Sequence, residues 1–213
     1  MIDGQKVLLT CATHDGNVCA GFAGGVGACA GLLGGVAFIS GNSHVALARN
    51  CQAAAFLASP FEWMLSIDAD IQFVRRDMEI LLDGDEQIVA ARYAKKELNE
   101  TRPAAFGLGF ARIHRGVFDA LKELKYEGDA DDPNNGAPLI GSFFWQGQVM
   151  DDYFPSGPDM GSHWVGEDHG FFSLCHRAGV TARDETRCKL IHWGRHGYAY
   201  DAPSDATVSD VPI

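Results

Sequence analysis

Two aspartates separated by one residue are the most informative chemical feature of this sequence. Asp68 and Asp70 directly follow a short apolar run, residues 63–67, that is typical of a β-strand. Ligands of open α/β sheets bind beyond the carboxyl ends of the strands. Carboxylates gathered there repel each other unless a cation separates them, and such oxygen ligands suit Mg²⁺ or Mn²⁺ together with substrate phosphates. The pattern predicts a divalent-metal site, with a turn carrying two solvated acids as the simpler alternative.

A second acidic pair, Glu167 and Asp168, follows Gly166 and stands among aromatic residues. The dipole of a helix favours acids in its first turn, so the pair has a purely structural explanation. The aromatic neighbours on both sides instead indicate a walled pocket. A carboxylate in such a pocket can act as a general base toward a hydroxyl group.

A histidine completes the set of candidate groups. His192 ends an apolar run, residues 189–192, and a loop with spaced glycines follows it. Its neutral imidazole can bind a metal ion, although a histidine in such a position more often has a structural hydrogen bond.

Alternating apolar runs and helical patterns must position these groups. We expect strands at residues 7–11, 36–39, 63–67, 87–91, 106–113 and 189–192. We expect helices in the glycine-rich segment after residue 16, from a Ser43 cap to Pro60, and at residues 78–82, 117–124 and 167–177. This order predicts an α/β fold, a Rossmann-like three-layer α/β/α sandwich with a mostly parallel central sheet. With 213 residues and no evident repeat or linker, one domain over residues 1–213 is expected.

Residues 18–39 carry no charge, and these 22 residues are long enough to span a bilayer. Seven of them are glycine, so we expect a helix that packs closely in a soluble protein and no transmembrane segment. Gly25, Gly27 and Ala30 match a degenerate dinucleotide-binding pattern, but the first strand ends more than ten residues earlier. We therefore interpret these glycines as helix-packing residues rather than a phosphate-binding loop.

The charge balance limits the possible partners. Seventeen Lys and Arg stand against 28 Asp and Glu, a net charge of −11, which argues against a general nucleic-acid or anionic-membrane binder. Residues 92–115 are locally basic, with six bases and two acids. This stretch is either a solvated face or a surface for a phosphorylated acceptor or DNA. The bases are Arg92, Lys95, Lys96, Arg102, Arg112 and Arg115.

Six cysteines without a CxxC pair indicate free thiols in a reducing compartment. The first apolar run, residues 7–11, is too short for a signal peptide. We expect a cytoplasmic location.

The motifs and their order resemble the GT-A glycosyltransferases that use nucleotide-diphosphate sugars. The D-x-D motif at residues 68–70, the G-E-D motif at 166–168 and the final His192 follow the family pattern. Residues 45–50 look like the "ARN" helix of many such enzymes, and residues 107–110 resemble their glycine-containing strand beside the sugar.

The resemblance implies a metal-dependent enzyme. Asp70 would coordinate Mn²⁺ or Mg²⁺ through the donor diphosphate. Asp68 would lie beside the metal or the ribose, and His192 would be the third protein contact to the metal. Asp168 would be the base that deprotonates the acceptor hydroxyl, and Glu167 would orient acceptor or donor. Inversion by single displacement is favoured.

The resemblance also implies where the donor, most simply a UDP-sugar, would bind. The residues that would border its nucleotide and sugar are Thr10, Thr13, Asp15, Arg49, Gly107 and Gly109. The acceptor would be a hydroxyl on a glycan, lipid, protein or modified DNA base. Either of the two long loops, residues 128–141 and 151–162, could close over the donor.

Two other classes stay open. A sugar-phosphate nucleotidyltransferase usually has a basic residue in a glycine-rich loop after the first strand, whereas residues 12–17 contain no Lys or Arg. A non-catalytic sugar-binding module would use its aromatic side chains and would not need the D-x-D motif. Those aromatic residues are Trp145, Trp164, Trp193 and Tyr198.

Overall fold

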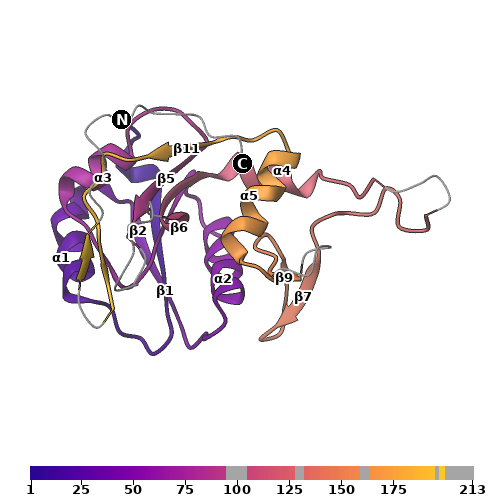
Figure 1. The fold of residues 1–213 in the computed structure, drawn as a ribbon, viewed down its shortest axis with the longest axis horizontal. Helices are drawn as coiled ribbons and strands as arrows, with labels where there is room; N and C mark the ends of the chain where they lie inside the picture. Colours follow the sequence, from indigo (N-terminus) through magenta and orange to yellow (C-terminus); the bar gives the residue numbers. More distant parts are fainter. Residues whose placement is uncertain (95–104, 128–131, 159–163, 195–196, 200–213) are drawn as a thin grey trace.

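A six-stranded sheet forms the centre of the protein in a computed structural model that describes residues 1–94, 105–127, 132–158, 164–194 and 197–199 (Figure 1). The strand order is β11-β5-β6-β3-β1-β2. Five strands run in one direction: β1 (Val7–Thr13), β2 (Gly35–Ser40), β3 (Trp63–Ile67), β5 (Ile88–Tyr93) and β11 (Ala182–Glu185). Strand β6 (Ala105–His114) lies between β3 and β5 and runs antiparallel to both. The predicted mostly parallel sheet is confirmed; β11 was not expected.

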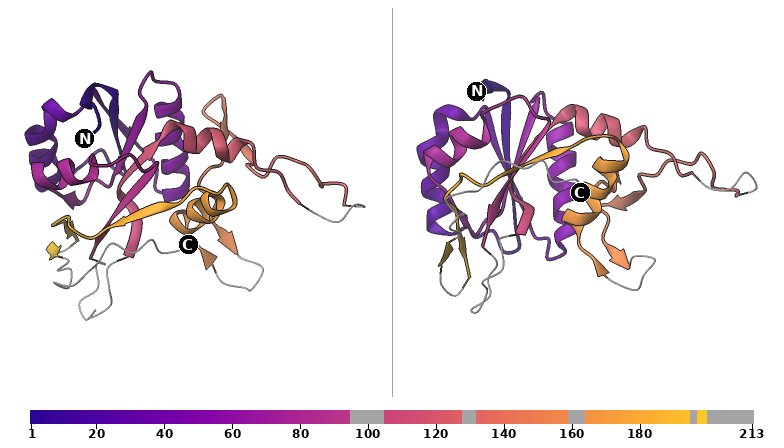
Figure 2. Two further views of the ribbon diagram at one scale, coloured as in Figure 1. Left: turned by 90° about the horizontal axis from the view of Figure 1, so that it is seen from above. Right: turned by 45° about the horizontal axis from the view of Figure 1, so that its top comes forward.

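Helices cover both faces of this sheet, so the three-layer α/β/α arrangement is confirmed (Figure 2). The helices are α1 (Ala20–Cys29), α2 (Val45–Leu57), α3 (Arg75–Leu81), α4 (Arg115–Lys122) and α5 (Glu167–Arg177). Side chains of successive strand residues point to opposite faces, and β1 shows the consequence. Val7 and Leu9 belong to the core under α1 and α3, whereas Leu8 belongs to the core under α2, α4 and α5.

Helix α1 explains the uncharged, glycine-rich segment. A methyl group added to Gly25 would lie 2.7 Å from the carbonyl oxygen of Phe73, and one added to Gly21 would lie 2.5 Å from the side chain of Gln72. These glycines let α1 lie directly against the chain around β4 (Ile71–Gln72), which confirms the packing interpretation for Gly25. It was wrong for Gly27, where an added methyl group would meet no atom of the described residues within 4 Å. A 3₁₀ turn, Ala30–Leu32, follows the helix. Within the described residues, no helix is both long enough and apolar enough to cross a membrane.

Two predictions were wrong: the residue that caps α2 and the sheet to which the final strand belongs. Helix α2 is capped by His44, whose Nδ1 accepts a hydrogen bond from the amide of Leu47 at 3.4 Å, rather than by Ser43. The final strand, β12 (Ile191–Trp193), is outside the central sheet. It pairs instead with β4 and with β13 (Gly197–Ala199).

Shorter elements complete the fold. Strands β7 (Ser142–Trp145) and β8 (Gln148–Asp151) form a hairpin that was not predicted. Strands β9 (Gly157–Pro158) and β10 (Trp164–Val165) pair with each other, and a 3₁₀ turn, Gly4–Lys6, precedes β1.

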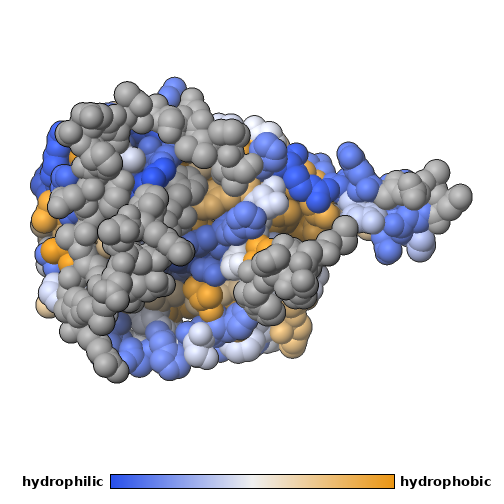
Figure 3. Space-filling model, in the orientation of Figure 1, coloured by the Kyte–Doolittle hydropathy of each residue, from blue (hydrophilic) through white to orange (hydrophobic). Residues whose placement is uncertain are grey.

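A ribbon-like arm extends away from the body after α4 (Figure 1). Tyr126 donates its amide hydrogen to the carbonyl of Ala137, and Leu139 donates to Leu124, both at 2.9 Å. Hydrophilic residues dominate the described part of the arm (Figure 3). The long loop predicted at residues 128–141 is therefore partly one side of this ribbon.

The locally basic stretch does not form one basic surface. Arg112 is fully buried and donates to the backbone carbonyls of residues 83, 84 and 86. Arg115 donates to the carbonyls of residues 56, 57, 59 and 61, and Arg92 pairs with Asp184. Three bases that suggested an acceptor surface are thus used inside the fold. The other three, Lys95, Lys96 and Arg102, lie outside the described residues.

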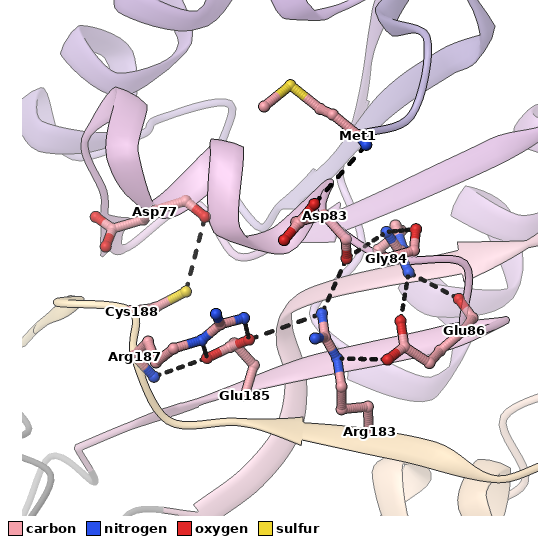
Figure 4. A network of polar contacts seen from close by, with 10 residues as sticks. Met1, Asp77, Asp83, Gly84, Glu86, Arg183, Glu185, Arg187 and Cys188 are labelled. Carbon is pink, nitrogen blue, oxygen red and sulfur yellow. Dashed lines mark hydrogen bonds and ion pairs between the residues drawn. The ribbon is translucent and has the colours of Figure 1, made fainter. Parts of the chain in front are cut away.

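Charged side chains fix the outer strand β11 to the segment before β5 (Figure 4). Arg183 donates to the carbonyl oxygen of Asp83 at 3.0 Å and lies 3.4 Å from a carboxylate oxygen of Glu86. Glu185 forms a 2.6 Å ion pair with Arg187. Charges on an edge strand discourage pairing with another chain, so this edge is protected.

We predict opposite effects of two alanine substitutions in α1. Gly25→Ala should lower the free energy of unfolding by about 1–3 kcal/mol, because the new methyl group meets backbone atoms of Phe73. Gly27→Ala, where the same methyl group meets no atom within 4 Å, should raise it by about 0.5–1 kcal/mol because alanine favours a helix more than glycine does. Urea denaturation of both variants measures the difference, and equal effects would contradict the packing role of Gly25.

Candidate active site

The candidate site forms where the strands of the central sheet end. Because β6 runs against its neighbours, its first residues reach the edge at which β3 and β5 end. The amide of Asp68 donates to the carbonyl oxygen of Gly109 at 2.9 Å and continues the β3–β6 pairing into the D-x-D motif. The first turn of α5 comes to the same place, since Asp168 contacts Leu108 of β6. Three motifs far apart in sequence therefore meet at one edge.

Two glycines of β6 make room for the acidic side chains. A methyl group on Gly107 would lie 2.6 Å from Oδ2 of Asp168, and one on Gly109 would lie 2.7 Å from Oδ2 of Asp68. Both methyl groups would also lie 2.7 Å from the hydroxyl oxygen of Tyr93. The β5–β6 register shifts here, with residues 107–110 opposite a single residue of β5, and such bulges re-aim side chains. The close approach of these oxygens to the strand requires glycine.

A buried arginine holds the first aspartate. Arg49 on α2 is almost fully buried, and its guanidinium lies 2.7 Å from Oδ1 of Asp68. The same group donates to the hydroxyl of Ser66 at 2.8 Å and to the amide oxygen of Gln52 at 3.3 Å. Burial alone would lower the pKa of Arg49, but the carboxylates of Asp68 and Asp168 outweigh it and hold that pKa above its usual value. Arg49 is therefore a fixed positive charge beneath the D-x-D motif.

Asp168 is a weakly solvated carboxylate. Its Oδ2 accepts a 3.1 Å hydrogen bond from the amide of Leu108, whereas Oδ1 is buried and has no hydrogen-bond partner within the described residues. Burial raises the pKa of Asp168 to about 6. The negative charges of Glu167 and Asp68 act in the same direction, and Arg49 opposes them. Asp168 is thus a stronger base than an exposed aspartate.

Asp70 and His192 form a pair on the outer side of the motif. The β4–β12 pairing places His192 Nε2 3.5 Å from Oδ1 of Asp70. Nδ1 of His192 lies 2.8 Å from the carbonyl oxygen of Ala94, which can only accept, so Nδ1 carries the hydrogen and Nε2 faces the carboxylate. A metal-binding histidine is commonly oriented in this way.

The residues fit a metal that has two protein ligands. Asp68 points to Arg49, and in the described part of the chain no three His, Cys, Asp or Glu side chains are grouped to hold an ion. Mg²⁺ and Mn²⁺ often take only one or two protein ligands and complete their shell with substrate phosphates and water. Asp70 and His192 match that requirement.

A pocket of about 510 Å³ is lined by Arg49, Asp68 and Asp70, whereas His192 and Asp168 are not among its lining residues. The walls of the pocket come from the end of β1 with the loop after it, within residues 12–19, and from the start of α2 with the loop before it, within residues 42–45. Its inner end is formed by Arg49 and residues 68–70. Its volume lies within the range of small-molecule sites.

The residues expected to border a nucleotide separate into two groups. Thr13, Asp15 and Arg49 line the pocket. Thr10 is fully buried, donates its hydroxyl to the carbonyl of Leu65 at 3.0 Å and does not reach the pocket. Glu167 is the first residue of α5 and lies next to Asp168.

Two residues of the site were not recognised in the sequence. The hydroxyl of Tyr93 accepts a hydrogen bond from the amide of Gly109 at 3.3 Å, and burial with the nearby Asp68 and Asp168 raises the pKa of Tyr93 above its usual value. The sequence signal that could have identified Tyr93 was its position at the end of a buried strand, similar to the position of Asp68.

The second of these residues is Asn50, which belongs to the "ARN" segment but was given no role of its own, and which follows Arg49 on α2. Its amide nitrogen donates to a carboxylate oxygen of Asp152 at 2.7 Å, and its oxygen accepts from the amide of Tyr153 at 2.9 Å. Asn50 therefore fixes the segment after β8 to the helix that supports Asp68.

Comparison with known proteins gives the fold but no family. No family model matches the sequence, and no curated protein matches it. The crystal structure of A197 from STIV is similar at a TM-score of 0.55 and 14% identity, covering 96% of this chain and 98% of that one. A glycosyltransferase involved in the glycosylation of the major capsid of PBCV-1 gives a TM-score of 0.35 at 13% identity, covering 53% of this chain and 61% of that one. At these identities the likeness concerns the fold alone, and the second is too weak to carry an argument.

The raised pKa of Asp168 predicts a pH-dependent stability. The folded protein binds this proton more tightly than the unfolded chain, whose aspartate has a pKa of 3.8, so the free energy of unfolding should fall as the pH rises from about 4 to about 6. Asp168→Asn removes the buried charge and should be more stable than the parent at pH 7.5 by roughly 1–3 kcal/mol. This gain in the free energy of unfolding over the parent protein should disappear near pH 4.

Thermal unfolding from pH 4 to pH 8 measures this difference, with Asp119→Asn, at an exposed acid of α4, as the matched control. A loss of stability in Asp168→Asn at pH 7.5 would contradict the buried, poorly solvated carboxylate.

Proposed function

We propose that this protein is a metal-dependent glycosyltransferase that moves a sugar from a nucleotide-diphosphate donor, most simply a UDP-sugar, to an acceptor hydroxyl. The observation that carries the proposal is the convergence of Asp68, Asp70, Asp168 and His192 at the carboxyl edge of the sheet, beside the 510 Å³ pocket. The α/β fold supports it only as a compatible scaffold, since one fold hosts many functions.

The charges of the pocket support a donor that arrives with a cation. Arg49 is the only Lys or Arg among the described residues that line the pocket, and Asp68 already neutralises it. Among the described residues that line the pocket, a diphosphate therefore meets no unpaired positive charge. Asp70 and His192 would hold the ion, Mn²⁺ or Mg²⁺, which supplies the positive charge that stabilises the departing diphosphate.

Asp168 would act on the acceptor. A carboxylate with a pKa of about 6 is mostly ionised at neutral pH, yet it binds a proton more readily than an exposed aspartate does. The acceptor hydroxyl would give its proton to Asp168 as its oxygen bonds to the anomeric carbon. The bond from that carbon to the diphosphate oxygen breaks at the same time, and its electron pair leaves with the nucleotide diphosphate.

Arg49 would act through Asp68 rather than on the donor. Its guanidinium is buried and fixed by Ser66 and Gln52, so it cannot turn toward a ligand without losing these bonds. Its charge would keep Asp68 ionised and oriented at the inner end of the pocket. Glu167, whose charge raises the pKa of Asp168, would help to tune the base.

A donor screen tests the proposal. UDP-, GDP- and dTDP-sugars are added with Mn²⁺ or with EDTA, and thermal shift and nucleotide release are measured. We expect a UDP-sugar to stabilise the protein only when Mn²⁺ is present. Asp70→Ala should abolish this stabilisation, since it removes one of the two metal ligands.

Substitution of the base should separate binding from turnover. Asp168→Asn should keep the metal-dependent stabilisation by the donor but release nucleotide about 10²–10⁴-fold more slowly, the range for loss of a general base. Asp119→Asn serves as the control with unchanged binding and release. Full activity in both Asp70→Ala and Asp168→Asn would exclude the proposed function.

A further inference from the structure

Two buried polar groups beside Gly107 have hydrogen-bonding capacity that the described residues do not use. Oδ1 of Asp168 is buried and accepts no hydrogen bond within the described residues. The hydroxyl of Tyr93, on a side chain that is 9% exposed, accepts one from the amide of Gly109, and its own hydrogen has no acceptor in the described part of the chain. An unused donor and an unused acceptor deep in a protein each cost free energy unless a further molecule satisfies them.

The backbone at Gly107 brings these two groups together. The position of a methyl group on this glycine is 2.6 Å from Oδ2 of Asp168 and 2.7 Å from the hydroxyl oxygen of Tyr93. The two side chains arrive from different elements, α5 and the end of β5, and converge on one residue of β6. Their proximity follows from the fold.

The phenol ring has little freedom to turn away. It packs edge-on against the imidazole of His192, with the ring centroids 5.1 Å apart. The amide of Gly109 holds the hydroxyl oxygen from the other side. With one lone pair bound to this amide, the hydroxyl hydrogen is left to point at another acceptor.

Only some chemical groups fit between a fixed donor and a carboxylate. An alcohol hydroxyl can accept from Tyr93 and donate to Asp168 at once. An ammonium group has no lone pair to accept with, and a carboxylate has no hydrogen to donate and is repelled by the acids. A water molecule satisfies the same two atoms when no ligand is bound.

We propose that Tyr93 and Asp168 together form the acceptor-hydroxyl position of this protein, in which Tyr93 donates a hydrogen bond to the oxygen that Asp168 deprotonates. The inference rests on the proposed function and deepens it: the acceptor is an alcohol, and Tyr93 selects and orients it. The proton leaves the acceptor for Oδ1 of Asp168, while Tyr93 keeps its own proton throughout. The sugar comes from the nucleotide-diphosphate donor, whose diphosphate departs with the bonding electron pair.

A crystal structure of the chain at about 1.5 Å or better tests the site without any activity. We expect an ordered water oxygen within about 3 Å of both the Tyr93 hydroxyl oxygen and Oδ1 of Asp168. This oxygen should be lost in Tyr93→Phe, which keeps the ring packed against His192. A direct hydrogen bond from Tyr93 to Asp68 or Asp168 with no oxygen between them would overturn the inference, as would an unchanged water in the variant.

Kinetics give the second test. Release of UDP from the stabilising UDP-sugar, with water as acceptor, should be about 10-fold slower in Tyr93→Phe at saturating donor, while KM for the donor changes less than two-fold. The matched control is Tyr153→Phe, since Tyr153 is also buried but gives its hydroxyl hydrogen to Asp151 instead. It should change neither value.

The kinetic result also has clear contrary outcomes. A parallel rise in KM for the donor, or equal effects of Tyr93→Phe and Tyr153→Phe, would overturn the role of Tyr93. If no UDP-sugar is turned over at all, the proposed function fails, and the crystal structure still decides whether Tyr93 and Asp168 share a hydroxyl-sized ligand.

Discussion

The close approach of like charges to one strand is the constraint on which this structure depends. Asp68 and Asp168 are 100 residues apart in the sequence, and both lie against the glycines at the start of β6. Two carboxylates so near each other are costly unless positive charge or hydrogen bonds compensate. Arg49 supplies that charge from beneath, and the amide of Leu108 in β6 donates a hydrogen bond to Asp168. The antiparallel direction of β6 is what brings its glycines to the same edge as the ends of β3 and β5.

The candidate site contains buried polar groups that lower the stability of the fold. Oδ1 of Asp168 and Nε of Arg49 are buried without partners in the described part of the chain, and Asp168 is held at a raised pKa by burial. Functional sites commonly retain such groups because a pre-formed arrangement avoids reorganisation during the reaction. Such atoms also occur elsewhere in the described residues: Arg112 and Arg115 donate to several backbone carbonyls each, yet Nε of Arg112 is buried without a partner as well. What distinguishes Arg49 is its partner: Arg112 and Arg115 donate to backbone carbonyls, whereas Arg49 pairs with the carboxylate of Asp68.

Local sequence patterns predicted the elements of the sheet well. The residue roles that these patterns missed depend on contacts between residues far apart in the sequence. Residues 63–67 and 167–177 form the expected strand and helix because apolar runs and a first-turn acid pair act locally. The segments at 68–70, 107–110 and 166–168 meet at one edge of the sheet, and their roles as site residues stay a prediction. The roles of Tyr93 and Arg49 were not readable, since each depends on a partner on another element. The basic stretch at 92–115 misled for the same reason: charge counts do not reveal that Arg112 points inward.

Helix α2 gives two consecutive side chains to two different parts of the protein. Arg49 holds Asp68 at the inner end of the pocket, while Asn50 holds Asp152 and the amide of Tyr153. Adjacent residues of one helix cannot move independently, so the pocket and the segment after β8 share a single rigid support. A displacement of α2 would carry both in the same direction, and neither could open while the other stayed in place. Arg49 and Asn50 thereby couple the position of Asp68 to that of the segment after β8.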